Sequence, residues 1–481
     1  MRRLPNPIRL LLLWIGFGLA RLGLLRRDHV KRTTELSWPR IVTGIARMSK
    51  NAVDVAMVGI AIGPLAISGV GLASPFWGIA FSLGGGFAAG TIALVSQRYG
   101  ADAHDELAQA IRSSVLLVVV VTIPVMTVFH FFPTQLIDVL SSDPQVVDLG
   151  AQYLRVLSFG VPFAALNLIG SRIYIGVDDA WTPMLLRSGG AVANVALNAV
   201  FIFELGMGVT GAALGTVLAN VLVTTTFVVA LLSGRLPGVG ALPVQVSPIG
   251  RYADLENLRQ LVKIGVPVIG RNMVWTVAKF PMLAIVGMFG STVLAAYVIS
   301  RRIWGIMNTP GWGFALASSS LVGQELGAGD EAEAESYARG VIVFSVATYA
   351  VAGLLVGVFA EPIVRLFVDN PNDPAVPIAV ALVYAACFAV VGQGVKSATA
   401  GPLDASGDTR WPFYSQVLGM FGFTIPVAYL GATTALGLFG LYLSFAAETF
   451  VPAAINYYRF STGKWKAISR EYRPDQPMAD D

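Results

Sequence analysis

A carboxylate stands inside the first long apolar run of this sequence, at Asp54. Asn51 lies three residues earlier, so the two side chains share one face of a helix. A charged group inside a bilayer is costly and normally faces the protein interior or a wet cavity. We therefore predict that Asp54 binds a coupling cation, which is either sodium held by oxygen ligands or a proton that neutralises the buried carboxylate. The alternative is a plain ion pair with Lys50, one helical turn away.

Two amides share a helix face in a later apolar segment. Asn194 and Asn198 are four residues apart, which places them one above the other on a helix. Amides on such a face commonly hold helices together through hydrogen bonds. The spacing alone leaves helix packing and cation binding open.

Lys279 lies in an apolar run of the second half of the chain, at the position that Asn51 occupies in the first half when Gly59 is aligned with Gly287. An ammonium repels a metal ion, so we expect the second half not to hold sodium in the same way. The alternative to a functional role is snorkelling, or an ion pair with an acid. We favour a pair, and Glu448 in the last apolar run is the candidate.

Arg301 and Arg302 form a second positive feature, near the outer end of an apolar run. They could bind an anionic group or stabilise an outward-facing cavity. We favour the simpler interpretation, an extracellular helix end in contact with lipid headgroups.

The composition is that of a membrane protein. Of 481 residues, 55% are hydrophobic and 13% are charged, against about 25% charged in soluble domains. The net charge of +4 arises from basic residues at the ends of apolar segments, which indicates a membrane surface and excludes a nucleic-acid groove. The single cysteine, Cys387, excludes an internal disulfide and a cysteine-based zinc site.

Apolar runs of about 20 residues recur along the whole chain, and each is long enough to cross a bilayer as a helix. The predicted spans are 38–62, 69–96, 113–133, 150–175, 184–204, 208–232, 262–289, 293–323, 338–360, 377–400, 411–431 and 434–458. Lysine and arginine concentrate on one side of these spans. The sequence therefore predicts a multi-pass protein of the cell membrane with both termini in the cytoplasm.

The spans divide into two groups of six. We predict an N-terminal bundle at 38–232, a Gly- and Pro-rich cytoplasmic linker at 233–261 and a C-terminal bundle at 262–460, followed by a cytoplasmic tail at 461–481. The arm at 1–37 is apolar and then basic without a clear cleavage site, so an interfacial helix is favoured over a signal peptide.

The two bundles are copies of one unit. Residues 76–101 and 303–328 align without gaps, and 12 of the 26 positions are identical. The shared residues include Trp77 and Trp304, which would rarely recur by chance in two apolar helices. An even number of helices per copy gives both copies the same membrane orientation. This predicts an all-α protein of twelve transmembrane helices, arranged as two parallel six-helix repeats around a central cavity that rock to give alternating access.

Three motifs carry a resemblance to a known family. They are Asn51-Ala-Val-Asp54 before Val58-Gly59, Leu94-Val-Ser-Gln97-Arg-Tyr-Gly100-Ala-Asp with its second copy from Leu321, and Asn194-Val-Ala-Leu-Asn198 before Gly211-Ala-Ala-Leu-Gly-Thr216. Together they resemble the multidrug and toxic compound extrusion (MATE) family, of prokaryotic type, over roughly residues 38–460.

The resemblance implies a secondary transporter that exports amphipathic organic cations in exchange for sodium or protons, for which a monomer suffices. It also implies a cation site lined by Asp54, Asn194, Asn198 and Thr216. One branch of the family has a second aspartate at the position of Asn198, and the amide here argues against a proton switch with two carboxylates.

Two other functions compete with export. Flippases of lipid-linked oligosaccharides or other anionic lipids belong to the same superfamily, and Lys279 with the Arg301/Arg302 pair keeps that alternative open. An intramembrane enzyme would need an acid/base or metal set, and the sequence shows no Ser/His/Asp set, Cys/His set or phosphate-binding loop. We therefore expect no enzymatic activity and no cofactor, and transport that is driven by a gradient.

Overall fold

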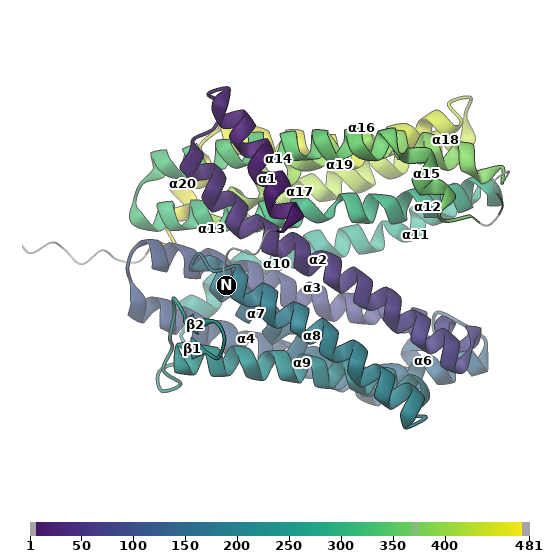
Figure 1. Cartoon of the computed structure of the whole chain (residues 1–481), viewed down its shortest axis with the longest axis horizontal. Helices are drawn as coiled ribbons and strands as arrows, with labels where there is room; N and C mark the ends of the chain where they lie inside the picture. The colour runs from purple at the N-terminus through teal and green to yellow at the C-terminus, as the bar shows by residue number, and fades with distance from the viewer. Residues whose placement is uncertain (1–5, 369, 371–372, 474–481) are drawn as a thin grey trace, which may run out of the picture. The chain divides into compact units, whose positions relative to one another are not determined.

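The computed structural model describes residues 6–368, 370 and 373–473 (Figure 1). Long helices make up nearly all of the described chain, because a backbone surrounded by lipid must satisfy its hydrogen bonds within each segment. The described residues divide into two compact units, an N-terminal unit of Val42–Ile269 and a C-terminal unit of residues 6–41 and 270–473.

The N-terminal unit is built around α3, which packs against α4, α6 and α7, while α8 packs against α9. Its elements are α3 (Pro64–Gly100), α4 (His104–Phe131), α5 (Pro133–Asp138), α6 (Pro144–Leu157), η1 (Ser158–Gly160), α7 (Val161–Gly176), α8 (Trp181–Ala199), η2 (Val200–Glu204), α9 (Gly208–Ser233), β1 (Arg235–Leu236) and β2 (Gly240–Ala241). The two strands pair antiparallel in the segment that was predicted as a linker.

The C-terminal unit is built around α16, which packs against α12, α13, α14 and α19. Its elements are α1 (Pro7–Arg21), α11 (Lys279–Gly287), α12 (Ser291–Met307), α13 (Thr309–Ala328), α14 (Glu331–Val358), α15 (Ala360–Arg365), α16 (Ala375–Ala405), α17 (Arg410–Val417), η3 (Leu418–Thr424), α18 (Ile425–Thr433), α19 (Leu438–Ser461) and α20 (Lys464–Ser469).

Two helices are shared between the units. Helix α2 (Arg27–Ile62) groups with the C-terminal unit up to Ile41 and with the N-terminal unit from Val42 onwards. Helix α10 (Leu255–Val277) groups with the N-terminal unit up to Ile269 and with the C-terminal unit beyond it. Each helix holds a proline within three residues of this change, Pro39 in α2 and Pro267 in α10. The shift that aligns Gly59 with Gly287 also aligns these prolines. Each helix therefore passes from one unit to the other at an equivalent position of the two repeats, and we call this the helix exchange.

Close helix packing beside these prolines depends on glycine. Gly86 of α3 faces α10, and a Cβ atom at this position would lie 2.7 Å from the carbonyl oxygen of Gly265. Its repeat counterpart Gly313 of α13 faces α2, and a Cβ atom there would lie 2.7 Å from the carbonyl oxygen of Ser37. Both distances are too short for any side chain, so each exchanged half-helix packs backbone against backbone.

Ten helical stretches of the described chain are long and apolar enough to span a membrane. Two of the twelve predicted spans fall outside this set, because one contains several charged residues and the other is interrupted between two helices. Span 38–62 lies in α2 and carries Arg47, Lys50 and Asp54. Span 293–323 carries Arg301 and Arg302 and is divided at Asn308 into α12 and α13. Both remain helical, and their low hydropathy reflects polar residues inside the membrane.

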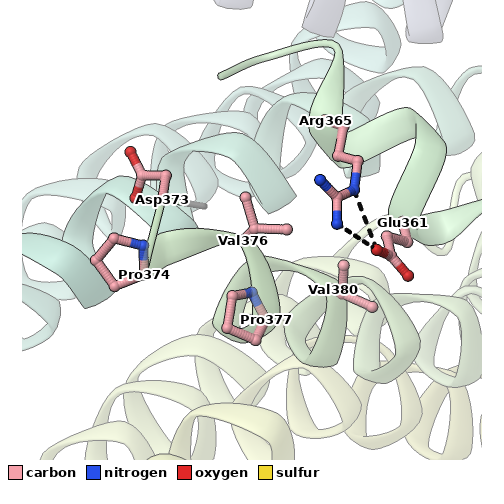
Figure 2. A pocket seen from close by; sticks show the side chains of 7 residues that line it. All are labelled: Glu361, Arg365, Asp373, Pro374, Val376, Pro377 and Val380. Atoms are coloured by element: carbon pink, nitrogen blue, oxygen red, sulfur yellow. Dashed lines mark hydrogen bonds and ion pairs between the residues drawn. The ribbon is translucent and has the colours of Figure 1, made fainter. Parts of the chain in front are cut away.

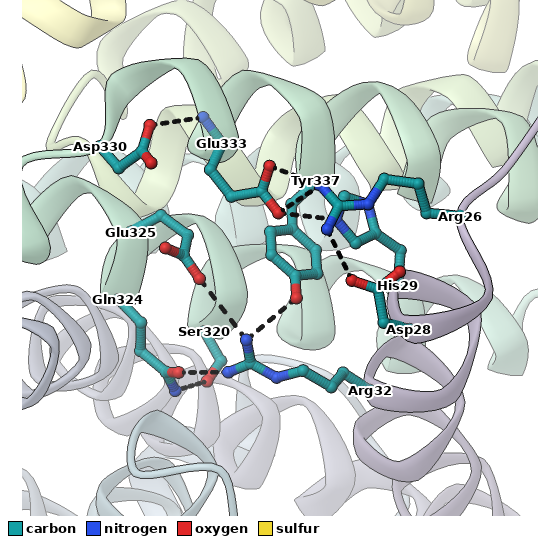
Figure 3. A network of polar contacts seen from close by, with 10 residues as sticks. All are labelled: Arg26, Asp28, His29, Arg32, Ser320, Gln324, Glu325, Asp330, Glu333 and Tyr337. Carbon is teal, nitrogen blue, oxygen red and sulfur yellow. Dashed lines mark hydrogen bonds and ion pairs between the residues drawn. The ribbon is translucent and has the colours of Figure 1, made fainter.

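The basic end of the N-terminal arm is held by the C-terminal unit (Figure 3). Arg26 donates to both carboxylate oxygens of Glu333 at 2.8 and 2.9 Å, and the buried His29 lies 2.9 Å from the same carboxylate. Arg32 donates to Gln324 at 2.8 Å and to the Tyr337 hydroxyl at 3.0 Å. These contacts fix the start of α2 on α13 and α14.

Candidate intramembrane polar site

Four predicted site residues lie together in the N-terminal unit. Asn198 of α8 donates to a carboxylate oxygen of Asp54 of α2 at 2.9 Å. Asn194, one turn earlier on α8, donates to the hydroxyl of Thr216 of α9 at 3.1 Å. The Asn198 amide also lies 3.4 Å from the Asn194 carbonyl oxygen, so the four side chains form one continuous network. Asn51, the fifth candidate in this unit, is exposed.

This network continues along α9 through residues that the sequence analysis did not single out. Asn220 donates to the backbone carbonyl of Thr216 at 2.8 Å and accepts from Asn167 of α7 at 2.9 Å. Thr224 in turn donates to the Asn167 carbonyl oxygen at 2.8 Å. Thr216, Asn220 and Thr224 are spaced by four residues, and this polar stripe on α9 was readable from the sequence.

Both oxygens of the Asp54 carboxylate have partners. Lys50 donates to one oxygen in an ion pair along α2, and Asn198 donates to the other. The Asp54 side chain is 17% exposed, so the pair is largely removed from water. The ion pair that the sequence analysis offered as the alternative is therefore present together with the polar network.

The donor set suits a small cation. Asp54, Asn194 and Thr216 offer carboxylate, amide and hydroxyl oxygens, which are the ligands that hard cations prefer. The carbonyl oxygen of Asn198 is buried and accepts no hydrogen bond from the described residues. A buried acceptor without a donor costs about 1–3 kcal/mol, and a bound cation is one means of satisfying it. The single carboxylate matches a single positive charge, sodium or a proton.

The C-terminal unit arranges its charges differently. Glu448 of α19 accepts two hydrogen bonds from Arg301 of α12, at 2.7 and 3.2 Å. The predicted pair between Lys279 and Glu448 is therefore wrong. Arg301 reaches Glu448 with a forked guanidinium that matches both carboxylate oxygens, whereas the Lys279 ammonium lies 3.8 Å from the centre of the Trp275 ring. Arg302, the neighbour of Arg301, is exposed.

A pocket of about 450 Å³ lies elsewhere in the C-terminal unit (Figure 2). It is lined by Glu361, Arg365, Asp373, Pro374, Val376, Pro377 and Val380. Glu361 accepts from Arg365 one turn away, and Asp373 accepts from the backbone amide of Ala375 at 2.8 Å. None of the predicted site residues lines this pocket.

Comparison with known proteins identifies the family. The MatE family model matches residues 39–200 and again 267–430, which together exceed half of the chain. The chain belongs to the MatE family. The resemblance seen in the motifs is thus confirmed, and the two matches fall on the two copies of the repeat. MatE proteins are transporters, a class distinct from enzymes.

Several curated relatives of the chain are named as multidrug resistance proteins. The chain is 26% identical over 443 residues to a probable multidrug resistance protein NorM of Bradyrhizobium diazoefficiens, which covers 90% of this chain and 93% of the relative. It is 23% identical to a probable multidrug resistance protein YoeA of Bacillus subtilis, over 90% of this chain and 94% of the relative.

Solved structures share the fold. An outward-facing multidrug resistance MATE transporter matches with a TM-score of 0.83 and 21% identity, over 92% of this chain and 96% of the other. A transporter from Pyrococcus furiosus, described by a reversed polarity of its binding pocket, matches with a TM-score of 0.84 and 21% identity, over 91% and 96% of the two chains. The chain is thus an all-α, multi-pass membrane transporter of the twelve-helix class, as predicted.

Proposed function

We propose that this MatE protein exports amphipathic small molecules, organic cations among them, in exchange for sodium or protons that enter at Asp54. The network that joins Asp54, Asn198, Asn194 and Thr216 is the observation that carries the proposal. The multidrug resistance names of its relatives support export of varied compounds. The proposal places the protein in the cell membrane with both termini in the cytoplasm and a monomer as the working unit.

The role of each residue follows from its chemistry. Asp54 supplies the one negative charge of the network and therefore binds the coupling cation. Asn194, Asn198 and Thr216 supply neutral oxygens, and they connect the carboxylate on α2 to α8 and α9. A change in charge at Asp54 is thereby transmitted to two further helices, which is what a coupling site must do.

A coupling cation must compete with Lys50 for the Asp54 carboxylate. The Lys50 ammonium already neutralises Asp54, so a cation that binds the carboxylate must displace Lys50. An ion pair with little exposure to water is costly to break unless the incoming charge replaces it. Lys50 thus holds the site closed to cations until the coupling ion is at sufficient concentration.

The proposal is tested by transport in liposomes. Wild type and Asp54→Asn are reconstituted, and export of a fluorescent organic cation, the ethyl ester of rhodamine B, is followed under an imposed sodium or pH gradient. We expect export by the wild type with one of the two gradients, which identifies the coupling ion, and none by Asp54→Asn. Asp148→Asn is the matched control, because Asp148 is an exposed acid of the same unit and should transport normally.

Two outcomes contradict the proposal. Normal coupling by Asp54→Asn would show that Asp54 is only the partner of Lys50. Failure of both gradients to move the dye, in a wild type that transports an anionic lipid, would favour the flippase alternative.

A further inference from the structure

Three arginines lie close together in the membrane-spanning part of the N-terminal unit. They are Arg47 of α2, Arg172 of α7 and Arg187 of α8, and Arg187 lies within electrostatic range of both of the others. Arg172 is one turn before the end of α7 and Arg187 is in the second turn of α8, so the short connection at 177–180 brings both to one membrane level. Among the described residues, no carboxylate forms an ion pair with Arg172 or Arg187.

The guanidinium groups of Arg172 and Arg187 also lack hydrogen bonds to the part of the chain that the structure describes, and the Nη1 atom of each is buried. Other arginines of the same unit have partners. Arg98 donates to the Asn257 side chain at 2.8 Å, and Arg112 donates to a backbone carbonyl at 3.0 Å. A buried guanidinium nitrogen without a partner is unfavourable, because it has lost its hydration and gained nothing in exchange.

Arg47 supplies the third positive charge. Its guanidinium carbon lies 5.0 Å from the centre of the Phe81 ring of α3. The ring holds the guanidinium in place, but it has no net negative charge with which to neutralise it. Arg187 therefore faces two further positive charges across short distances, and like charges repel.

This arginine cluster is separate from the network at Asp54 and lies next to it along two helices. Arg47 is seven residues before Asp54 on α2, and Arg187 is seven residues before Asn194 on α8. Seven residues are close to two turns, so each arginine shares a helix face with its network residue, about 10 Å away along the helix axis. The cluster lies toward the ends of α2 and α8 that are cytoplasmic in the proposed topology.

Snorkelling is the simpler explanation for basic residues near helix ends. A snorkelling arginine extends its guanidinium to the membrane surface, where water surrounds the charge. Arg172 and Arg187 are instead half-buried, and the buried Nη1 atoms lie at the charged ends of the side chains. The guanidinium groups are therefore partly enclosed by protein, which is the arrangement of a site and not of a surface anchor.

We propose that Arg47, Arg172 and Arg187 form a binding site for a phosphate group. A phosphate presents several negatively charged oxygens, and each guanidinium offers a planar fork of donors that matches two of them. The three side chains are only half-buried, so an incoming group can reach them. The phosphate is either the headgroup of an anionic phospholipid or free phosphate, which have the same chemistry at the site. The inference goes beyond the proposed export function and does not depend on which ion drives it.

The test is equilibrium binding to the full-length protein in a neutral detergent, measured by isothermal titration calorimetry. The two probes are inorganic phosphate and the short-chain lipid dioctanoyl phosphatidylglycerol, each titrated at constant ionic strength with chloride as the balancing anion. We expect saturable binding of phosphate. Displacement of bound phosphate by phosphatidylglycerol would assign the site to a lipid headgroup, and phosphate binding that the lipid does not affect would assign it to the free anion.

The variants locate the binding. Arg172→Gln and Arg187→Gln should each weaken phosphate binding by roughly ten-fold, as expected when one charge-assisted hydrogen bond is lost. Arg187→Lys should weaken it less, because lysine keeps the charge and loses only the fork. Arg235→Gln, which removes an exposed arginine of the same unit, should bind phosphate as the wild type does.

Melting temperatures separate binding from folding. Without phosphate, Arg187→Gln should melt at least as high as the wild type, because it removes a charge that two neighbours repel. With phosphate, the wild type should gain more stability than the variant. Three results would overturn the inference: no saturable binding of either probe to the wild type, binding that is unchanged when Arg172 and Arg187 are both replaced by glutamine, or a lower melting temperature of Arg187→Gln without phosphate.

Discussion

The two units of this transporter keep the same packing and differ in their polar chemistry. Glycines at equivalent positions make the same close approach, and prolines at equivalent positions stand beside the two helix exchanges. The position of Asp54 in the first copy is Met282 in the second, by the same alignment that sets Lys279 opposite Asn51. Duplication thus preserved what the backbone needs, and the ionisable residues were free to diverge.

The carboxylates of the two units are consequently held in different ways. Asp54 is held by a lysine of its own helix and by one amide, and both are groups that an incoming cation can replace. Glu448 is locked by a forked guanidinium from another helix. The first arrangement suits exchange, and the second suits permanent attachment of α12 to α19.

The largest effect should come from breaking the permanent pair. Glu448→Gln leaves the Arg301 guanidinium without its carboxylate, and we expect a loss of about 3–5 kcal/mol in the free energy of unfolding, seen as a marked drop in melting temperature. Asp54→Asn should lower the melting temperature less, because an asparagine side chain can still accept the hydrogen bond from Asn198. Glu361→Gln is the control, because it removes an exposed pair with Arg365 that is worth at most about 1 kcal/mol. Equal melting of all three variants would contradict the contrast between the units.

Substitution of Pro39 and Pro267 tests whether the equivalent prolines of the two units have the same role in transport. Pro39→Ala and Pro267→Ala each restore a backbone donor inside a helix, where proline costs about 3 kcal/mol. We expect both variants to straighten and stiffen their helices and to slow export to a similar extent, with dye binding unchanged. Transport rates in liposomes, beside equilibrium binding, provide the measurement. A strong effect at only one proline would show that the units do not move symmetrically.

Lys50→Met tests whether the Lys50 ammonium competes with the coupling cation for Asp54 in the N-terminal unit. Without the ammonium, Asp54 is open to the coupling cation, and the cation concentration for half-maximal export should fall by about ten-fold. Lys50→Arg should retain the wild-type value, since it keeps a positive charge one turn from Asp54. An unchanged value in the methionine variant would mean that Lys50 does not compete with the cation.

The smallest effect concerns the tail helix α20 at the C-terminal unit. Arg470 donates to Glu331 at 2.7 and 3.0 Å, and Lys466 pairs with Glu335. Hydrogen bonds from these basic residues lower the pKa of both glutamates. Their contribution is therefore present above the usual glutamate pKa and is lost as the pH falls through the lowered values, below about pH 4.3.

Hydrogen exchange of residues 464–469 measures this loss. We expect weaker protection of α20 in acid, by at most about 1 kcal/mol for each exposed pair. The double variant Glu331→Gln and Glu335→Gln should already show the weaker protection at neutral pH. Protection that is the same in the variant and the wild type at neutral pH would mean that the pairs do not hold α20.

Much of the fold was predictable because lipid restricts the choice of structure. A run such as 377–400 has one solution in a membrane, a helix, and α16 contains it. The repeat was equally visible, since close packing demands glycine at the same places in both copies. The first and last residues of the helices were less predictable. Helix α10 begins at Leu255, seven residues before the predicted span, because its polar first turns look like a linker.

The site was predictable only in part. The motifs brought Asp54 together with Asn194, Asn198 and Thr216, and the structure joins all four. Asn220 and Thr224 were missed, although their four-residue spacing from Thr216 on one helix is itself a signal. The partner of Glu448 was predicted wrongly, because the sequence alone allows Lys279, Arg301 or Lys396 to be that partner. Only the three-dimensional course of α12 decides among them.

The exchange of half-helices also sets an order for biogenesis. The N-terminal unit remains incomplete until the ribosome has made residues up to Ile269, although its predicted last span ends at residue 232. The segment up to Ile41 is synthesised first and finds its final neighbours, such as Glu333, only when the second repeat emerges. Neither repeat is therefore a self-sufficient product of translation. In a chain stopped between the repeats, the N-terminal unit lacks the α10 segment up to Ile269, and the α2 segment up to Ile41 lacks its partners. Both defects would be exposed to the quality-control machinery of the membrane.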